Sequence, residues 1–203
     1  LALIAALPVT ASAQALPDGR GLVAKHVAAM GGREAMDKHS SLHMIGTFSM
    51  AAMGIEGPVN LWRAKPNKFV QTIVIGSFGE SAQGFDGTTA WANQPGAGYI
   101  ILSGEMADQA KSQADFLADF PEPGKYSSIE TVALEDFEGR KCYKVKLVKA
   151  AGGETIQYFD VETGLAAGSV RSTETQMGKI DITSVLSDYM EQGGVKMPSK
   201  VIQ

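Results

Sequence analysis

The side chains able to do chemistry are few and scattered along the sequence. All three histidines, His26, His39 and His43, lie near the start of the chain, and none belongs to a recognisable catalytic motif. No Gly-x-Ser-x-Gly, phosphate-binding glycine loop, Cys-x-x-Cys or His-Glu-x-x-His pattern occurs. Since Met36 and Met44 flank His39 and His43, a soft-metal site is one interpretation. No carboxylate or cysteine completes that set, so surface or capping roles for these histidines are favoured.

Carboxylate pairs and the single cysteine are the remaining chemical candidates. Glu135 with Asp136, and Asp115 with Asp119, have the residue types used for acid–base work on glycosides, but such pairs are usually solvated. Cys142 has basic neighbours that favour a thiolate, yet it lies in a strand-like run without a second cysteine. We therefore predict a half-buried structural cysteine, no catalytic site, no metal and no cofactor.

Methionine is the more informative residue type. Five of the nine methionines lie between Met30 and Met53, where they either fill a core or form an adaptable binding surface. A large antiparallel sheet that curls around helices must either pack its concave face or enclose a cavity. We predict an apolar cavity lined by Met44, Phe48, Met50, Leu61, Phe69, Ile73 and Ile75, and closed by a helix that contributes Met106, Ala110, Leu117 and Phe120.

The elements that position these residues are mostly strands. Asp18 is a suitable N-cap for a first helix that ends at Gly31-Gly32, and a second short helix is expected over residues 33–38. From residue 41 apolar residues alternate with a period of two, and Asp86-Gly87 is a hairpin signal. One helix of about four turns is expected over residues 103–120. The fold class predicted is mainly β (α+β): an incomplete antiparallel β-barrel of about ten strands wrapped around short helices.

Composition excludes some functions. The chain has 203 residues with 18 basic and 22 acidic side chains, a net charge of −4. This mild acidity argues against nucleic-acid binding, which needs a basic surface. The 23 glycines exceed the usual share and indicate many turns. Acidic residues dominate positions 105–138 and basic residues positions 140–149, which we interpret as cross-strand charge pairing on a solvated face.

The N-terminal residues resemble the end of a secretory signal peptide. An uncharged apolar run, Leu1 to Val9, is followed by two overlapping Ala-x-Ala patterns within residues 11–15. We therefore expect residues 1–15 to be a partial, cleaved signal and residues 16–203 to be one periplasmic domain, with a possible C-terminal truncation within a strand. No segment of the mature chain is apolar over the length needed to span a bilayer.

Four short motifs, in this order along the chain, resemble the periplasmic lipoprotein-sorting family with the LolA/LolB-like fold. They are a helix ending in Gly31-Gly32, the strand–turn–strand around Pro66-Asn67-Lys68-Phe69, the hairpin Asp86-Gly87 with Trp91, and the hairpin Asp160 with Thr163-Gly164. The resemblance implies an open antiparallel barrel that holds acyl chains. Carriers of that family have a basic residue after the Phe of the second motif, where this chain has Val70. Arg63 is the nearest candidate for a polar contact at the cavity.

The main functional hypothesis is a non-enzymatic periplasmic carrier or sensor that binds a lipid or the acyl chain of a lipoprotein. The alternative is a cell-envelope protein–protein interaction or regulatory module with a packed, unliganded interior. A solid concave face with an exposed apolar patch on the convex side would favour that alternative. A deep pocket with convergent histidine or carboxylate side chains would instead favour an enzyme.

Overall fold

Two open antiparallel sheets make up most of the molecule. The computed structural model describes residues 15–50, 54–150, 152–175 and 178–203. In this part of the chain the strands form two six-stranded sheets, and in each sheet neighbours in sequence are neighbours in space. The first sheet contains β1 (Ser41–Met50), β2 (Ile55–Ala64), β3 (Lys68–Val74), β4 (Glu80–Phe85), β5 (Ala90–Gln94) and β6 (Gly98–Ile101). The second contains β7 (Tyr126–Phe137), β8 (Arg140–Lys149), β9 (Glu154–Asp160), β10 (Ala166–Thr175), β11 (Gly178–Gln192) and β12 (Val195–Ile202).

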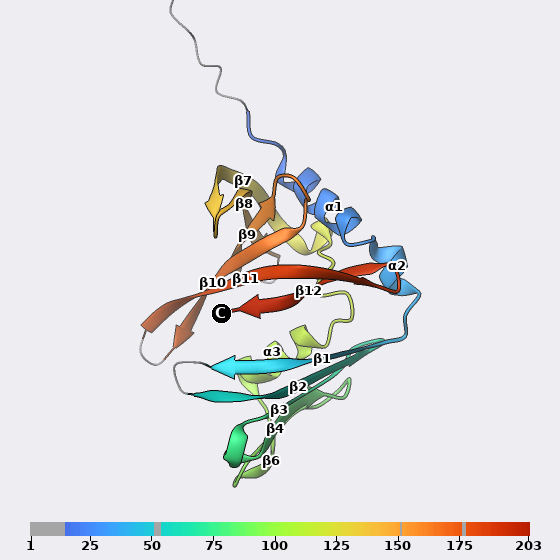
Figure 1. The fold of residues 1–203 in the computed structure, drawn as a ribbon, viewed down its shortest axis with the longest axis vertical. Coiled ribbons are helices and arrows are strands. Elements are labelled where there is room, and N and C mark those ends of the chain that lie inside the picture. The colour runs from blue at the N-terminus through green and yellow to red at the C-terminus, as the bar shows by residue number, and fades with distance from the viewer. Residues whose placement is uncertain (1–14, 51–53, 151, 176–177) are drawn as a thin grey trace, which may run out of the picture.

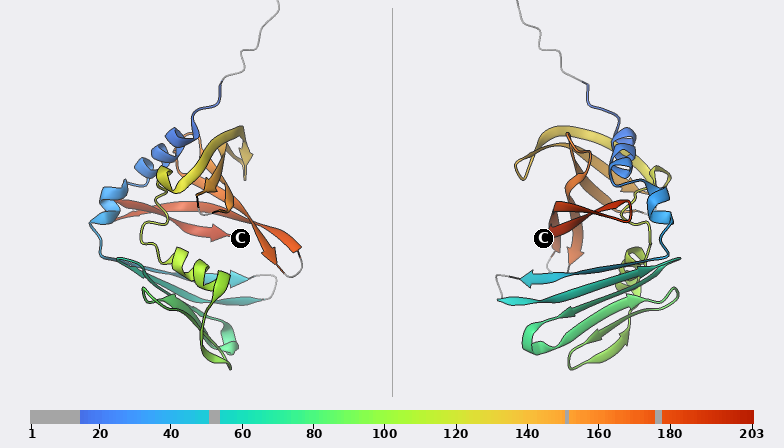
Figure 2. Two further views of the ribbon diagram at one scale, coloured as in Figure 1. Left: turned by 180° about the vertical axis from the view of Figure 1, so that it is seen from behind. Right: turned by 45° about the vertical axis from the view of Figure 1, so that its right-hand side comes forward.

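The predicted mainly-β fold is confirmed, with a correction to its architecture. The described residues contain twelve strands rather than about ten, and they form two sheets rather than one curled sheet. The reason is the segment between β6 and β7, which carries helix α3 (Gly104–Gln113) and lies between the sheets in Figures 1 and 2. The chain therefore leaves the first sheet before it begins the second.

The N-terminal helices form as their caps predict. Helix α1 (Gly19–Ala29) begins at Asp18, whose carboxylate accepts a hydrogen bond from the Gly21 amide, and α2 (Arg33–Asp37) follows it. Gly31, with φ of 102°, ends α1. A Cβ at Gly31 would lie 2.0 Å from the Gly194 carbonyl oxygen, so only glycine permits this close approach. The Lys196 amide then donates to the Met30 carbonyl at 2.9 Å, which joins the end of α1 to β12.

The helix predicted over residues 103–120 is wrong in its second half. Helix α3 ends at Gln113, and residues 114–120 form turns. The Asp115 carboxylate accepts a hydrogen bond from the Leu117 amide at 3.0 Å, which gives the backbone an alternative to the helical pattern. The apolar stripe read from the sequence is therefore divided: Ala110 remains on α3, whereas Leu117 and Phe120 pack elsewhere.

The short 3₁₀ turns and the hairpins follow local turn chemistry. Segments η2 (Gly76–Phe78) and η3 (Pro123–Lys125) precede β4 and β7. The Asp86 carboxylate accepts hydrogen bonds from the Thr88 and Thr89 amides, both at 2.8 Å, in the β4–β5 turn. The Asp160 carboxylate does the same with the Glu162 and Thr163 amides in the β9–β10 turn. Both predicted hairpins are thus confirmed.

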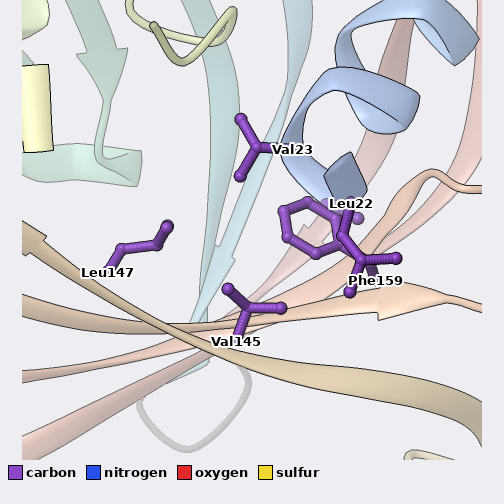
Figure 3. Close-up of a cluster of buried hydrophobic side chains, with 6 residues drawn as sticks. Leu22, Val23, Val145, Leu147 and Phe159 are labelled. Atoms are coloured by element: carbon purple, nitrogen blue, oxygen red, sulfur yellow. The ribbon is translucent and has the colours of Figure 1, made fainter. Parts of the chain in front are cut away.

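The inner face of the second sheet packs against α1. Figure 3 shows the cluster that joins them, in which Leu22 and Val23 of the helix meet Val145, Leu147 and Phe159 of β8 and β9. On the other face of the same sheet Lys144 pairs with Glu135 at 3.1 Å and Lys146 with Glu154 at 2.7 Å. These pairs confirm the predicted cross-strand charge pairing on β7, β8 and β9.

The predicted signal peptide, residues 1–15, falls almost wholly outside the described residues. Within the described ranges, no helix has the length and apolar character needed to cross a membrane. Cys142 is fully buried rather than half-buried, and burial raises the pKa of its thiol, so the reactive thiolate form is disfavoured.

The Val145 side chain provides a test of this packing. Replacing Val145 with Ala should lower the free energy of unfolding by about 2 kcal/mol, because it opens a cavity in the cluster of Figure 3. The same substitution at Val132, a partly exposed residue on neighbouring β7, should change it by less than about 0.5 kcal/mol. Urea unfolding of the two variants makes the comparison, and equal losses would contradict the assigned burial.

Candidate functional site

A cavity of about 360 Å³ lies against the inner face of the second sheet. Helix α1 and residues 118–121 form its other walls, and β1 and β2 of the first sheet each contribute one side chain, Met44 and Arg63. The exposed lining residues Arg171, Val201 and Gln203 mark its opening. The apolar part of the lining consists of Met30, Met44, Ala118, Pro121, Leu147, Phe159, Ala166, Leu186, Met197, Pro198 and Val201.

A row of polar side chains crosses the sheet at this cavity. Gln157 of β9, Ser169 of β10 and Ser184 of β11 are directly paired positions on adjacent strands, so their side chains share one face. The Gln157 amide donates to the Gly168 carbonyl at 3.1 Å, and the Gln203 amide donates to the Ser184 hydroxyl at 3.2 Å. The lining of the cavity is therefore partly polar, beyond the polar contact predicted at Arg63.

An ion pair bridges the first sheet to the segment after α3. The Arg63 guanidinium donates to the Asp119 carboxylate, and the arginine is largely buried whereas the aspartate is partly exposed. Among the described residues, the buried Nε of Arg63 has no hydrogen-bond partner. Leaving such a donor unpaired costs roughly 1–3 kcal/mol, so this corner of the cavity carries unused hydrogen-bonding capacity.

His26 of α1 lies buried in the cavity wall. Burial lowers the pKa of its imidazole from 6.5 to about 4, against smaller raising effects of the Gly164 backbone and the Asp119 carboxylate. Its ring packs against Phe159 with centroids 5.1 Å apart. Nδ1 is buried without a partner among the described residues. His26 is therefore neutral at pH 7 and is held in an apolar environment.

Tyr189 of β11 completes the polar part of the lining. Its hydroxyl donates to the Ala166 carbonyl at 2.9 Å, and burial raises its pKa to about 12. The Asp119 carboxylate also raises this pKa, while Arg140 lowers it. The tyrosine is thus a neutral hydrogen-bond donor at physiological pH.

The predicted site residues fall into three groups. Met44 and Arg63 line the cavity. Leu61, Phe69 and Ala110 form a packed cluster between α3 and the first sheet, while Leu117 and Phe120 pack with Met30 and Met36. Phe48, Ile73 and Ile75 are half-buried, Met106 is exposed, and the side chain of Met50 lies outside the described residues. The ligand-binding roles assigned to all of these residues stay predictions.

A second, more open cleft of about 690 Å³ lies beside α3. Ala107, Asp108 and Lys111 of the helix face Phe85, Ala90 and the β4–β5 turn across it, and Ile101 and Leu102 form one end. This is the place where the sequence predicted a cavity between a sheet and a closing helix. Here, however, the helix packs directly on β4 and β5 through Ala110 and Ala114, and the cleft lies at the margin of that contact.

Sequence reasoning missed most of the cavity lining. His26 falls within the apolar spacing of α1, between Leu22, Val23 and Met30, and this is the signal that could have marked it as a buried polar group. The polar row gives a second signal, because Gln157 and Ser184 stand two residues before Phe159 and Leu186, on the same face of their strands. Polar residues at inward positions of a strand indicate a cavity or a site.

The residues considered for catalysis are only partly brought together: His26 and Asp119 both line the cavity, whereas the other two histidines lie elsewhere. His39 hydrogen-bonds the Gly193 carbonyl at 3.0 Å, while His43 hydrogen-bonds Asn60 at 3.0 Å and stacks on Trp62. The Asp115 and Asp119 carboxylates pair with Lys125 and Arg63 respectively. In the ranges that the structure describes, no group of three His, Cys, Asp or Glu side chains is placed to hold a metal.

Several solved structures share this architecture. A LolA superfamily protein from Nitrosomonas europaea is 13% identical, with a TM-score of 0.55, and the match covers 92% of this chain and 84% of that one. A DUF1329 family protein from Desulfovibrio piger is 11% identical, with a TM-score of 0.54, and the match covers 93% of this chain and 87% of that one. An outer membrane lipoprotein-sorting protein domain from Vibrio parahaemolyticus is 10% identical, with a TM-score of 0.50, and the match covers 88% of this chain and 84% of that one.

These comparisons establish the fold. No protein-family model matches the sequence, and the comparison with curated proteins gives no match either. The chain has a LolA/LolB-like fold, as the order of its turn motifs predicted. At identities of 10–13%, the likeness extends to the fold and not to the ligand.

The buried histidine gives this site a measurable pH signature. The unfolded chain takes up a proton near pH 6.5 and the folded chain only near pH 4, so stability from neutral His26 is complete above pH 6.5 and is lost as the pH falls. Between about pH 7 and pH 4.5 the wild type should lose about 2 to 3 kcal/mol more unfolding free energy than His26→Gln.

Urea unfolding at the two pH values checks this expectation, with His43→Gln on the exposed face of β1 as the matched control. The control should show the same pH dependence as the wild type. The carboxyls of Asp115 and Asp160 have pKa values held below their ordinary value, so they remain charged over this interval. A His26→Gln variant with an unchanged pH dependence would contradict the buried neutral state.

Proposed function

We propose that this chain binds a lipid or the acyl chain of a lipoprotein in the cavity against the second sheet, and carries or senses it in the periplasm without catalysing a reaction. The observation that carries this proposal is the cavity itself, which opens on one side and has mainly apolar walls. Its volume lies at the lower end of the range of about 300–1,000 Å³ that is usual for small-molecule sites. One acyl chain fits this volume better than several.

Apolar contacts supply the affinity in this proposal. Each methylene buried against Met30, Leu147 and Leu186 contributes about 0.8 kcal/mol of gross binding free energy. The three methionines of the lining, Met30, Met44 and Met197, suit a flexible chain because their side chains adapt to different ligand shapes. Of the three histidines only His26 lines this cavity, and the carboxylate beside it, Asp119, is paired with Arg63.

The polar row in the cavity favours an amphipathic ligand. Gln157, Ser169 and Ser184 present amide and hydroxyl groups to the middle of the cavity floor. A pure hydrocarbon would leave these groups without water, at a cost in free energy. A ligand whose ester, amide or carboxyl oxygen lies over this row would avoid that cost, so a lipid with an accessible polar group is favoured.

The second candidate is an interaction module of the cell envelope. The exposed apolar residues at the far edge of the first sheet, among them Tyr99 and Ile101, favour some protein contact there. The open cavity, however, is the feature that a packed interior would lack, so lipid binding is placed first. The two functions involve different faces of the molecule and do not exclude each other.

Filling the cavity from the first sheet tests the lipid proposal. Met44→Trp adds bulk at a position that lines the cavity, and it should weaken binding of a fluorescent fatty acid by about tenfold or more, since about two methylene contacts are worth that much. Ile45→Trp is the matched control, because the adjacent side chain points to the opposite, exposed face of β1.

The native ligand is sought by mass spectrometry of the intact protein purified from the periplasm without detergent. A co-purifying lipid that is retained by Ile45→Trp and lost from Met44→Trp is expected. Wild-type protein that carries no lipid and does not bind the fluorescent fatty acid would overturn the proposal. Equal binding of the fatty acid by the two variants would show that it binds outside this cavity.

A further inference from the structure

The free edge of the first sheet is unusual in its chemistry. Strand β6 pairs with β5 on one side and ends the sheet on the other. Its sequence, Gly98-Tyr99-Ile100-Ile101, contains no charged residue and no proline, and Tyr99 and Ile101 are 76% and 72% exposed. Natural edge strands are usually protected by charges, prolines or bulges, because an unprotected edge pairs with other strands.

The unpaired backbone of β6 selects an extended chain as its partner. The Leu102 amide donates to the Ala90 carbonyl at 2.8 Å, so in the alternating antiparallel pattern Ile100 also faces β5. Tyr99 and Ile101 therefore direct their N–H and C=O groups away from the sheet. Only another strand supplies donors and acceptors at this spacing, whereas a lipid surface or a helix does not.

The surroundings of β6 fit a second copy of the same strand. Exposed Phe78 lies near the Gly98 end, where Gly79 approaches Pro95 of the β5–β6 turn, and exposed Met106 lies on α3 just beyond the Ile101 end. Antiparallel pairing about a two-fold axis places the Gly98 end of one strand beside the Ile101 end of its partner. Phe78 of one copy is then brought toward Met106 of the other, on both sides of the axis.

Charge and proline distinguish β6 from the two edges of the second sheet. Self-pairing of β7 would bring together strands that carry exposed Glu130 and Asp136. Strand β12 carries Lys200 and a proline at position 198, and proline removes a ladder hydrogen bond. Strand β1 is also uncharged and has no proline, but it lies on the side of the first sheet that faces the second sheet (Figure 1). On β6 no like charges meet, so the edge is self-complementary.

We propose that two copies of this chain pair through β6, so that their first sheets form one continuous antiparallel sheet across a two-fold axis. The apolar strip formed by Phe78, Tyr99, Ile100, Ile101 and Met106 is the centre of this interface. The inference does not depend on the ligand proposed above, because β6 lies outside the lining of that cavity.

Sedimentation equilibrium tests the pairing on the whole chain. At about 100 μM the wild type should have twice the 21.4 kDa monomer mass, if the dimer has the micromolar affinity typical of a small interface. Ile101→Lys should be monomeric because it places like charges across the axis. Ile45→Lys is the matched control: Ile45 is 74% exposed on the edge strand β1 of the same sheet, and this variant should remain dimeric.

Amide hydrogen exchange provides the second readout. Exchange at Tyr99 and Ile101 should slow as the protein concentration rises, whereas Ile100, whose amide is already bonded to β5, should not respond. Circular dichroism and the thermal midpoint of Ile101→Lys should match those of Ile45→Lys, which separates loss of pairing from loss of folding. A monomeric wild type at about 100 μM, or a dimer that persists in Ile101→Lys, would overturn the proposal.

Discussion

The architecture depends on one apolar joint between the two sheets. Met30 and Met36 of the first helices, Phe116 and Phe120 of the segment after α3, and Val195 of β12 are buried together, and Leu42 of β1 packs against them. Arg33 donates to the Phe120 carbonyl at 2.7 Å and so fixes that segment to α2. Since each sheet is open and would otherwise expose an apolar face, this cluster is what allows two such sheets to form one molecule.

The cavity follows from the way this joint is built. It holds the end of α1 and the 114–121 segment over the second sheet, so their side chains form a roof where a sandwich would have a second packed layer. The roof is closed by the Arg63–Asp119 pair rather than by apolar side chains alone. Such a pair, with a largely buried arginine and a partly exposed aspartate, contributes little net stability, because desolvation and solvent screening offset its attraction. Its presence is better explained by position than by energy: it links β2 to the wall of the cavity.

Local chemistry could be predicted from the sequence, and long-range placement could not. Caps and turns can be recognised from the sequence because they depend on residues that contact the neighbouring backbone, here Asp18, Gly31, Asp86 and Asp160. Alternation also identified the inner face of β1. Periodicity failed at residues 114–120, where burial of Phe116 and Phe120 in the joint outweighed helical spacing. No local pattern could show that Phe69 packs against α3 while Met44, on the same face of the same sheet, lines the cavity against the other sheet.

A shared fold does not determine the ligand, because the side chains that line the cavity can differ between proteins with the same sheets. The solved structures share the sheets at 10–13% identity, yet the floor of this cavity is set by paired side chains at Gln157, Ser169 and Ser184, which the fold leaves free to vary. A ligand in this cavity touches Met44 from one sheet and Leu186 from the other. The proposed ligand would therefore add contacts between the sheets to those of the apolar joint and the Arg63–Asp119 pair. A ligand that contacts both sheets stabilises the spacing at which it does so.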